Sequence, residues 1–91
     1  MTMAYSSRNL SVLAYANGFT LWHYGTTDKA VDVDTAGYFN PAADMLRVGD
    51  MIIGNVDTAA TAQAGIFVVR SNSGGVVNVS DLTALGATNT D

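Results

Sequence analysis

The side chains that most often carry out chemistry in proteins are scarce in this chain, which has one histidine, His23, and no cysteine. A zinc site needs several nitrogen or sulfur ligands, which this composition does not supply. A general base at His23 would need an orienting partner, and no local motif provides one. We therefore expect no enzyme, no cofactor and no metal site, and we expect His23 to pack on a hairpin opposite Val12.

Two further groups of residues could hold a ligand. Asp28, Asp32 and Asp34 are closely spaced carboxylates, but the central glycine and terminal glutamate of a calcium-binding loop are missing. We interpret them as a solvated acidic loop that could also meet basic groups on a partner. Gly49–Asp50 and Gly74–Gly75 are not followed by a helix and a lysine, so we interpret them as turns and not as phosphate-binding loops.

Composition limits the class of partner. The net charge is −4 and the four basic residues are scattered, whereas nucleic-acid binding needs a clustered basic face. No apolar run is long enough for a membrane span, and the first residues lack a signal-peptide pattern. Hydrophobic residues make up 48% of the chain and charged residues only 13%, against about 25% charged in an ordinary soluble domain. This surplus favours a subunit whose surface is partly covered by other protein.

The strongest structural signal is a β-hairpin over residues 11–24, with Asn17–Gly18 at its turn. This dipeptide suits a type I′ turn, in which both central residues take positive φ. Counting outward from the turn pairs Ala16 with Phe19, Ala14 with Leu21 and Val12 with His23. The opposite face then carries Leu13, Tyr15, Thr20, Trp22 and Tyr24. Both faces are apolar or aromatic, so one can serve the core and the other needs cover.

The other elements are expected to be short strands with one short helix. Asn40 and Pro41 are typical of a helix start, which predicts a helix over Pro41–Leu46. We predict an all-β fold, a small β-barrel or sandwich of five to six short strands, in one domain over residues 1–91. Its ends are expected to be a flexible arm over residues 1–9 and a loose tail over residues 85–91. The remaining predictions are a polar loop at Gly25–Gly37 with an edge strand at Ala30–Val33, strands at Met51–Val56, Gly65–Arg70 and Val76–Ser80, and a short element from Asp81 to Thr83.

Two stretches carry a resemblance to a known family: VLAYANGFTLWHYGTTD (Val12–Asp28) and DVDTAGYFNPAADMLRVGDMII (Asp32–Ile53). They resemble small proteins encoded beside the major coat protein of tailed bacteriophages, of the head decoration (cement) kind. The likeness covers roughly residues 10–56 and is looser over Gly65–Val79. It implies a β-rich capsid decoration protein, often a homotrimer, made in the bacterial host cytoplasm. Such a protein sits on the outer capsid surface of the virion and stabilises contacts between major capsid protein subunits.

The resemblance and the hairpin together suggest which residues make contact with other subunits. We expect Leu13, Tyr15, Trp22 and Tyr24 at a contact between subunits. We expect the arm, through Tyr5, Arg8 and Leu10, on the coat protein. The alternative is a fibre, spike or tail-associated module that anchors to the particle or recognises a receptor, with Tyr15, Trp22 and Tyr24 as a platform for a glycan.

Overall fold

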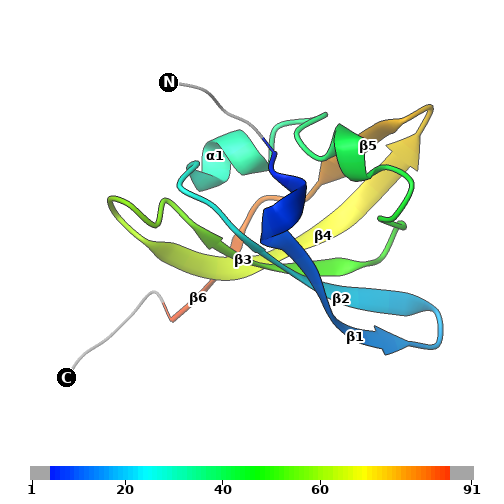
Figure 1. Cartoon of the computed structure of the whole chain (residues 1–91), viewed down its shortest axis with the longest axis horizontal. Coiled ribbons are helices and arrows are strands. Elements are labelled where there is room, and N and C mark those ends of the chain that lie inside the picture. Colours follow the sequence, from blue (N-terminus) through cyan, green and yellow to red (C-terminus); the bar gives the residue numbers. More distant parts are fainter. Residues whose placement is uncertain (1–4, 87–91) are drawn as a thin grey trace.

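The computed structural model describes residues 5–86, and nearly half of them lie in a single six-stranded sheet (Figure 1). The all-β prediction with one short helix is confirmed. The elements in chain order are the 3-10 helix η1 (Ser7–Asn9), β1 (Leu10–Ala16), β2 (Phe19–Gly25), α1 (Ala30–Val33), the 3-10 helix η2 (Asn40–Ala42), β3 (Met51–Val56), β4 (Gln63–Ser73), β5 (Val76–Val79) and β6 (Thr83–Leu85).

The strands follow the order β1-β2-β3-β4-β5, and β6 pairs with the first half of β4. All neighbours are antiparallel except β2 and β3, which run parallel. The sheet is open, so the strands do not close into the barrel that was one of the predicted architectures. In Figure 1 the tips of the β1–β2 and β4–β5 hairpins point apart, because the sheet twists between them.

The predicted hairpin forms around Asn17–Gly18. The predicted type I′ turn is wrong, because Gly18 has a φ of +99° but Asn17 does not take a positive φ. Ala16 pairs with Phe19 and Ala14 with Leu21, as predicted. A bulge between Val12 and Ala14 then shifts the register, because a bulge sets one extra residue against the partner strand. Val12 therefore lies opposite Trp22 and not opposite His23, which corrects the predicted pairing.

The segment between β2 and β3 contains α1 and η2 and is long, because parallel neighbours need a crossover connection. The edge strand predicted at Ala30–Val33 is wrong: these residues form α1, which buries Val33. The helix predicted over Pro41–Leu46 is also wrong in form, since only the 3-10 turn η2 is present. Asn40 does not cap it, because the Asn40 side-chain oxygen accepts a hydrogen bond from the backbone N–H of Val77.

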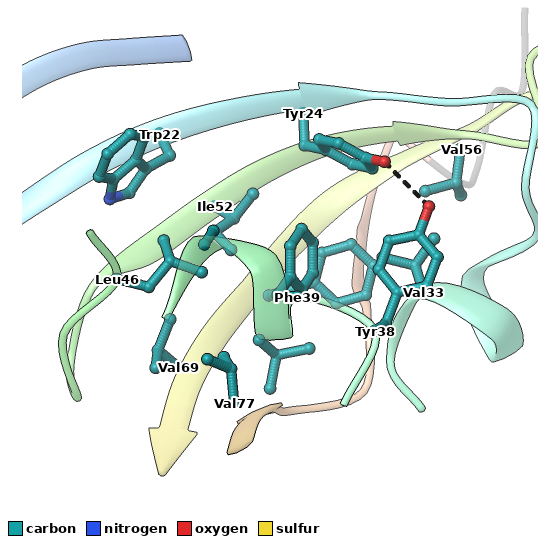
Figure 2. Packing of buried hydrophobic residues seen from close by; sticks show 13 residues of the cluster. Trp22, Tyr24, Val33, Tyr38, Phe39, Leu46, Ile52, Val56, Val69 and Val77 are labelled. Carbon is teal, nitrogen blue, oxygen red and sulfur yellow. Dashed lines mark hydrogen bonds between the residues drawn. The ribbon is translucent and has the colours of Figure 1, made fainter. Parts of the chain in front are cut away.

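The core lies between one face of the sheet, called the inner face below, and the crossover segment (Figure 2). Its aromatic centre is formed by Tyr5, Tyr24, Tyr38 and Phe39, with ring centroids between 5.1 and 6.4 Å apart. Trp22 lies at the other end of the core, near Leu46 (Figure 2). The buried apolar residues are Trp22, Tyr24, Val33, Tyr38, Phe39, Ala42, Leu46, Ile52, Val56, Phe67, Val69, Val77 and Val79.

Both predicted loose ends differ in part from the structure. From Tyr5 onward the N-terminal segment belongs to the fold, because the Tyr5 ring stacks on Tyr24 at 5.6 Å and η1 leads directly into β1. Leu85 belongs to β6 and so is not part of a loose tail. The remainder of both predicted segments, residues 1–4 and 87–91, lies outside the described residues.

Candidate interaction surface

A buried carboxylate fixes the base of the hairpin. Asp50, at the end of the turn before β3, is 1% exposed and accepts three hydrogen bonds. The donors are the backbone N–H groups of Thr20 and Arg47, at 3.0 and 3.1 Å, and the indole Nε1 of Trp22, at 3.2 Å. A buried carboxylate is stable only when such donors replace its lost water. Asp50 therefore holds β2 in place against the start of β3.

A second polar network crosses the aromatic end of the core. The Tyr38 hydroxyl donates to Asp28 at 2.7 Å and lies 2.9 Å from the Tyr24 hydroxyl, which accepts from the backbone N–H of Ser6. Burial, followed by the hydrogen bonds with Tyr24 and Asp28, raises the pKa of Tyr38 far above its usual range. Asp28 is buried, so the prediction that it belongs to a solvated acidic loop is wrong.

The face of the sheet opposite the core, called the outer face below, is apolar as well. Strand residues alternate between faces, so the neighbours of the buried positions on β2, β3 and β4 point away from the core. The register places Leu21, Met51 and Val68 in one row across these strands. The next row contains His23, Ile53 and Ile66. Phe19 and Ala16, a directly opposed pair, extend this surface toward the hairpin tip.

No part of the described chain covers the outer face. Phe19 and Met51 are more than a third exposed, and Leu21, Ile53, Ile66 and Val68 are half-buried without belonging to the core cluster. None of the outer-face positions on β1 to β3 is an aspartate, glutamate, lysine or arginine. On β4 the exposed Arg70 follows Val68 in the same alternation, so one charge borders this surface where β4 is bulged. At the usual strand spacing and rise, four strands of about six residues present roughly 400 Å² in plan. The apolar part of a surface of this extent is often functional.

Strand β1 borders this surface at the edge of the sheet. Every residue from Ser11 to Ala16 is exposed, and Tyr15, at 75%, is the most exposed of the large apolar side chains on this strand. Val12 and Leu13 are each more than half exposed. Within residues 5–86, β1 pairs with β2 alone, so its second edge presents unpaired backbone groups. The outer face and the β1 edge together form the candidate interaction surface.

The structure divides the seven predicted contact residues between surface and core. Leu13, Tyr15 and Arg8 are exposed and available to a partner, and the first two lie on β1. Tyr5 and Leu10 are half-buried and pack against the protein's own core. Trp22 and Tyr24 are buried, Tyr24 completely, and so have no surface for a partner or for a glycan platform. The expectation for these two residues is corrected, because β2 turns both toward the core, where Trp22 donates to Asp50 and Tyr24 packs against Tyr38 and Phe39.

The predictions missed most of the outer face. Met51, Ile53, Ile66 and Val68 were assigned to strands, but no contact role was given to them. A signal for it exists in the sequence, since residues 51–53 and 66–69 are continuous apolar runs and not an alternating pattern. Strands with such runs are usually covered on both faces.

The remaining polar candidates do not assemble into a site. His23 lies opposite Ser11, and its Nε2 is 2.7 Å from the side-chain oxygen of Asn55. Burial, and then the nearby carboxylates of Asp81 and Asp32, raises the pKa of Asp34. Among residues 5–86, histidine, aspartate and glutamate form no group of three suited to a metal ion. Over the same residues, no helix has the length and apolar character needed to cross a membrane.

Comparisons with protein-family models, with curated proteins and with solved structures found no match to this chain.

Proposed function

We propose that this chain is a capsid decoration protein, which binds the outer surface of a tailed-phage head and stabilises contacts between major capsid protein subunits. The role is one of binding, without catalysis. It is supported by the resemblance of residues 12–28 and 32–53 to decoration proteins. The observation that carries it is the outer face, a largely apolar surface that no described part of the chain covers.

The outer face could bind a coat subunit by burying its apolar side chains. Apolar area removed from water contributes about 25 cal/mol per Å², and association consumes part of this gain. One small subunit would therefore bind a capsid only moderately. Many copies that each bridge two coat subunits would stabilise the assembled shell by mass action, because they bind that state in preference to the unassembled one.

The first test is the copy number of this chain in purified virus particles, relative to the major capsid protein, by quantitative mass spectrometry. A ratio near one, or a simple fraction set by the symmetry axes, is expected of a decoration protein. A few copies per particle would instead support the fibre, spike or tail-associated module. Absence from the particle would refute the capsid role.

A binding assay tests the surface itself. Capsids that lack this chain are mixed with the purified protein and sedimented. Met51→Lys places a charge in the middle of the outer face at a site that is already 39% exposed, so the fold should tolerate it. We expect this variant to bind at least tenfold more weakly, because a charge would have to lose its water at an apolar contact. The matched control is Val31→Lys on α1, which is 70% exposed and should bind normally. Equal binding by both variants would remove the outer face from the proposal.

A further inference from the structure

The two edge strands of this open sheet, β1 and β5, differ in how far the protein itself covers them. At the β5 end, the edge is covered by the protein itself: the backbone N–H of Gly37 donates to the carbonyl of Val77 at 2.9 Å, and the N–H of Val77 donates to the Asn40 side chain. Strand β6 is only three residues long. Covering an edge and shortening it are both devices by which proteins prevent edge-to-edge pairing.

Strand β1 has little of this protection. It is seven residues long, LSVLAYA, without a lysine, a proline or any charged residue. Its one protective feature is the bulge at Leu13. An exposed apolar edge of this length pairs readily with another strand. The contrast with β5 indicates that the β1 edge is occupied in the working form of the protein.

We propose that the occupant is β1 of a second copy of this chain, paired antiparallel across a two-fold axis near Leu13. Such a contact must be self-complementary, and β1 meets this condition in charge and in size. Two identical strands without charges do not repel each other, although each chain carries a net charge of −4. Antiparallel pairing about Leu13 sets large residues against small ones, with Val12 opposite Ala14 and Tyr15 opposite Ser11. This pairing gives a dimer in place of the trimer that the resemblance implies, and it does not depend on the phage role.

The contact is small, so the dimer should be weak. Seven residues on each side are fewer than the 20 to 30 of a standard interface, and we expect a Kd on the order of 10 to 100 μM. Light scattering after gel filtration, over a concentration series on both sides of this range, should show the mass rising from one chain to two. A monomer at every concentration, or a trimer, would overturn the inference.

A charge swap at the two-fold axis identifies the contact. Leu13 is 54% exposed, so Leu13→Lys and Leu13→Glu should both fold, which thermal melting checks. Each variant alone should be monomeric, because like charges would face each other across the axis. An equimolar mixture of the two should recover the dimer. Val31→Lys should dimerise as the unmodified chain does, and dimers that form in Leu13→Lys alone would assign self-association to another surface.

Cross-linking provides a readout that does not depend on introducing charge. The chain has no cysteine, so Leu13→Cys carries a single thiol that can form a disulfide only between copies. Directly opposed residues of antiparallel strands lie close enough for this bond. We expect mild oxidation to give a covalent dimer of Leu13→Cys and little of Val31→Cys. Leu13→Lys is also tested for capsid binding by sedimentation. If neither cysteine variant cross-links and Leu13→Lys does not bind capsids, the β1 edge pairs with coat protein. That result refutes the self-pairing and leaves the decoration role intact.

Discussion

At the scale of single residues, this protein uses its few buried polar groups to fix structure and not to do chemistry. Asp50 is the clearest case, because all three of its donors come from the segments that it joins, β2 and the turn before β3. Tyr38 does the same at the other end of the core, where it connects Tyr24 to Asp28. Such networks stabilise a fold when every group has a partner, and they are costly when one group is left without.

Removal of the Tyr38 and Tyr5 hydroxyls should therefore change stability by different amounts. Tyr38→Phe deletes the hydrogen bonds with Asp28 and Tyr24, and we expect it to lower the free energy of unfolding by about 1–3 kcal/mol. Tyr5→Phe deletes a buried hydroxyl that has no hydrogen-bond partner among the described residues, and it should change stability by less than about 0.5 kcal/mol. Urea unfolding of both variants gives the comparison. Equal losses would mean that the Tyr38 network contributes nothing beyond packing.

The raised pKa of Asp34 predicts a pH dependence. Its carboxyl holds a proton more tightly in the folded chain than in the unfolded one, so its ionisation opposes folding. The protonated Asp34 carboxyl therefore contributes to the free energy of unfolding in acid. This contribution is lost as the pH rises through the raised pKa of Asp34. Asp34→Asn should thus melt at a higher temperature than the unmodified chain near neutral pH. The difference should shrink below about pH 4, where the native carboxyl is protonated as well. A difference that stays constant with pH would point to a cause other than ionisation.

At the scale of elements, the long strand β4 organises the sheet, since it pairs with β3, β5 and β6. Gly65 makes the contact with β6 possible. A Cβ at this position would meet the backbone carbonyl of Thr83 and the side chain of Leu82. The absence of a side chain at Gly65 thus lets the short strand β6 lie against β4.

Gly65→Ala should displace β6. We expect a loss of about 1–3 kcal/mol from overpacking, and faster amide exchange at Thr83–Leu85. Gly25→Ala is the matched control, because a Cβ there meets only the His23 ring at an ordinary 3.6 Å. That variant should be neutral or slightly more stable, owing to the smaller entropy of its unfolded chain. Unchanged exchange at β6 in Gly65→Ala would show that the strand adjusts without cost.

At the scale of the whole molecule, the sheet has two apolar faces, and residues 5–86 cover only one of them. The crossover between β2 and β3 supplies that cover, through residues such as Val33, Phe39 and Leu46. The outer face would normally carry polar residues in a sheet that is open to water. Its apolar character is the feature of the fold that most directly concerns binding.

An exposed apolar face should be detectable in the native protein. We expect a hydrophobic fluorescent dye to bind the folded chain, and Met51→Lys to reduce that binding by at least half while leaving the melting temperature nearly unchanged. Val31→Lys, with its charge on α1, should bind the dye as the unmodified chain does. Equal dye binding by the two variants would place the responsible apolar surface elsewhere.

Local chemistry allowed much of the strand pattern to be predicted from the sequence. The two-residue connection at Asn17–Gly18 and the strand over Met51–Val56 form as expected, because hairpin turns and apolar runs depend on neighbouring residues, although the turn is not of the predicted type I′. The β-rich class follows from the same signals. For the same reason, the exposed Leu13 and Tyr15 of the candidate surface could be identified beforehand, as members of an apolar hairpin.

Tertiary structure alone decided which of these apolar residues are covered. The bulge at Leu13, the burial of Trp22 and Tyr24 and the docking of Tyr5 all depend on contacts between distant segments. The parallel pairing of β2 with β3 likewise requires a crossover, which contains α1 and packs over the core. Local sequence instead predicted an edge strand at Ala30–Val33. Sequence periodicity shows that a strand has two apolar faces, but only the assembled core determines which one remains exposed.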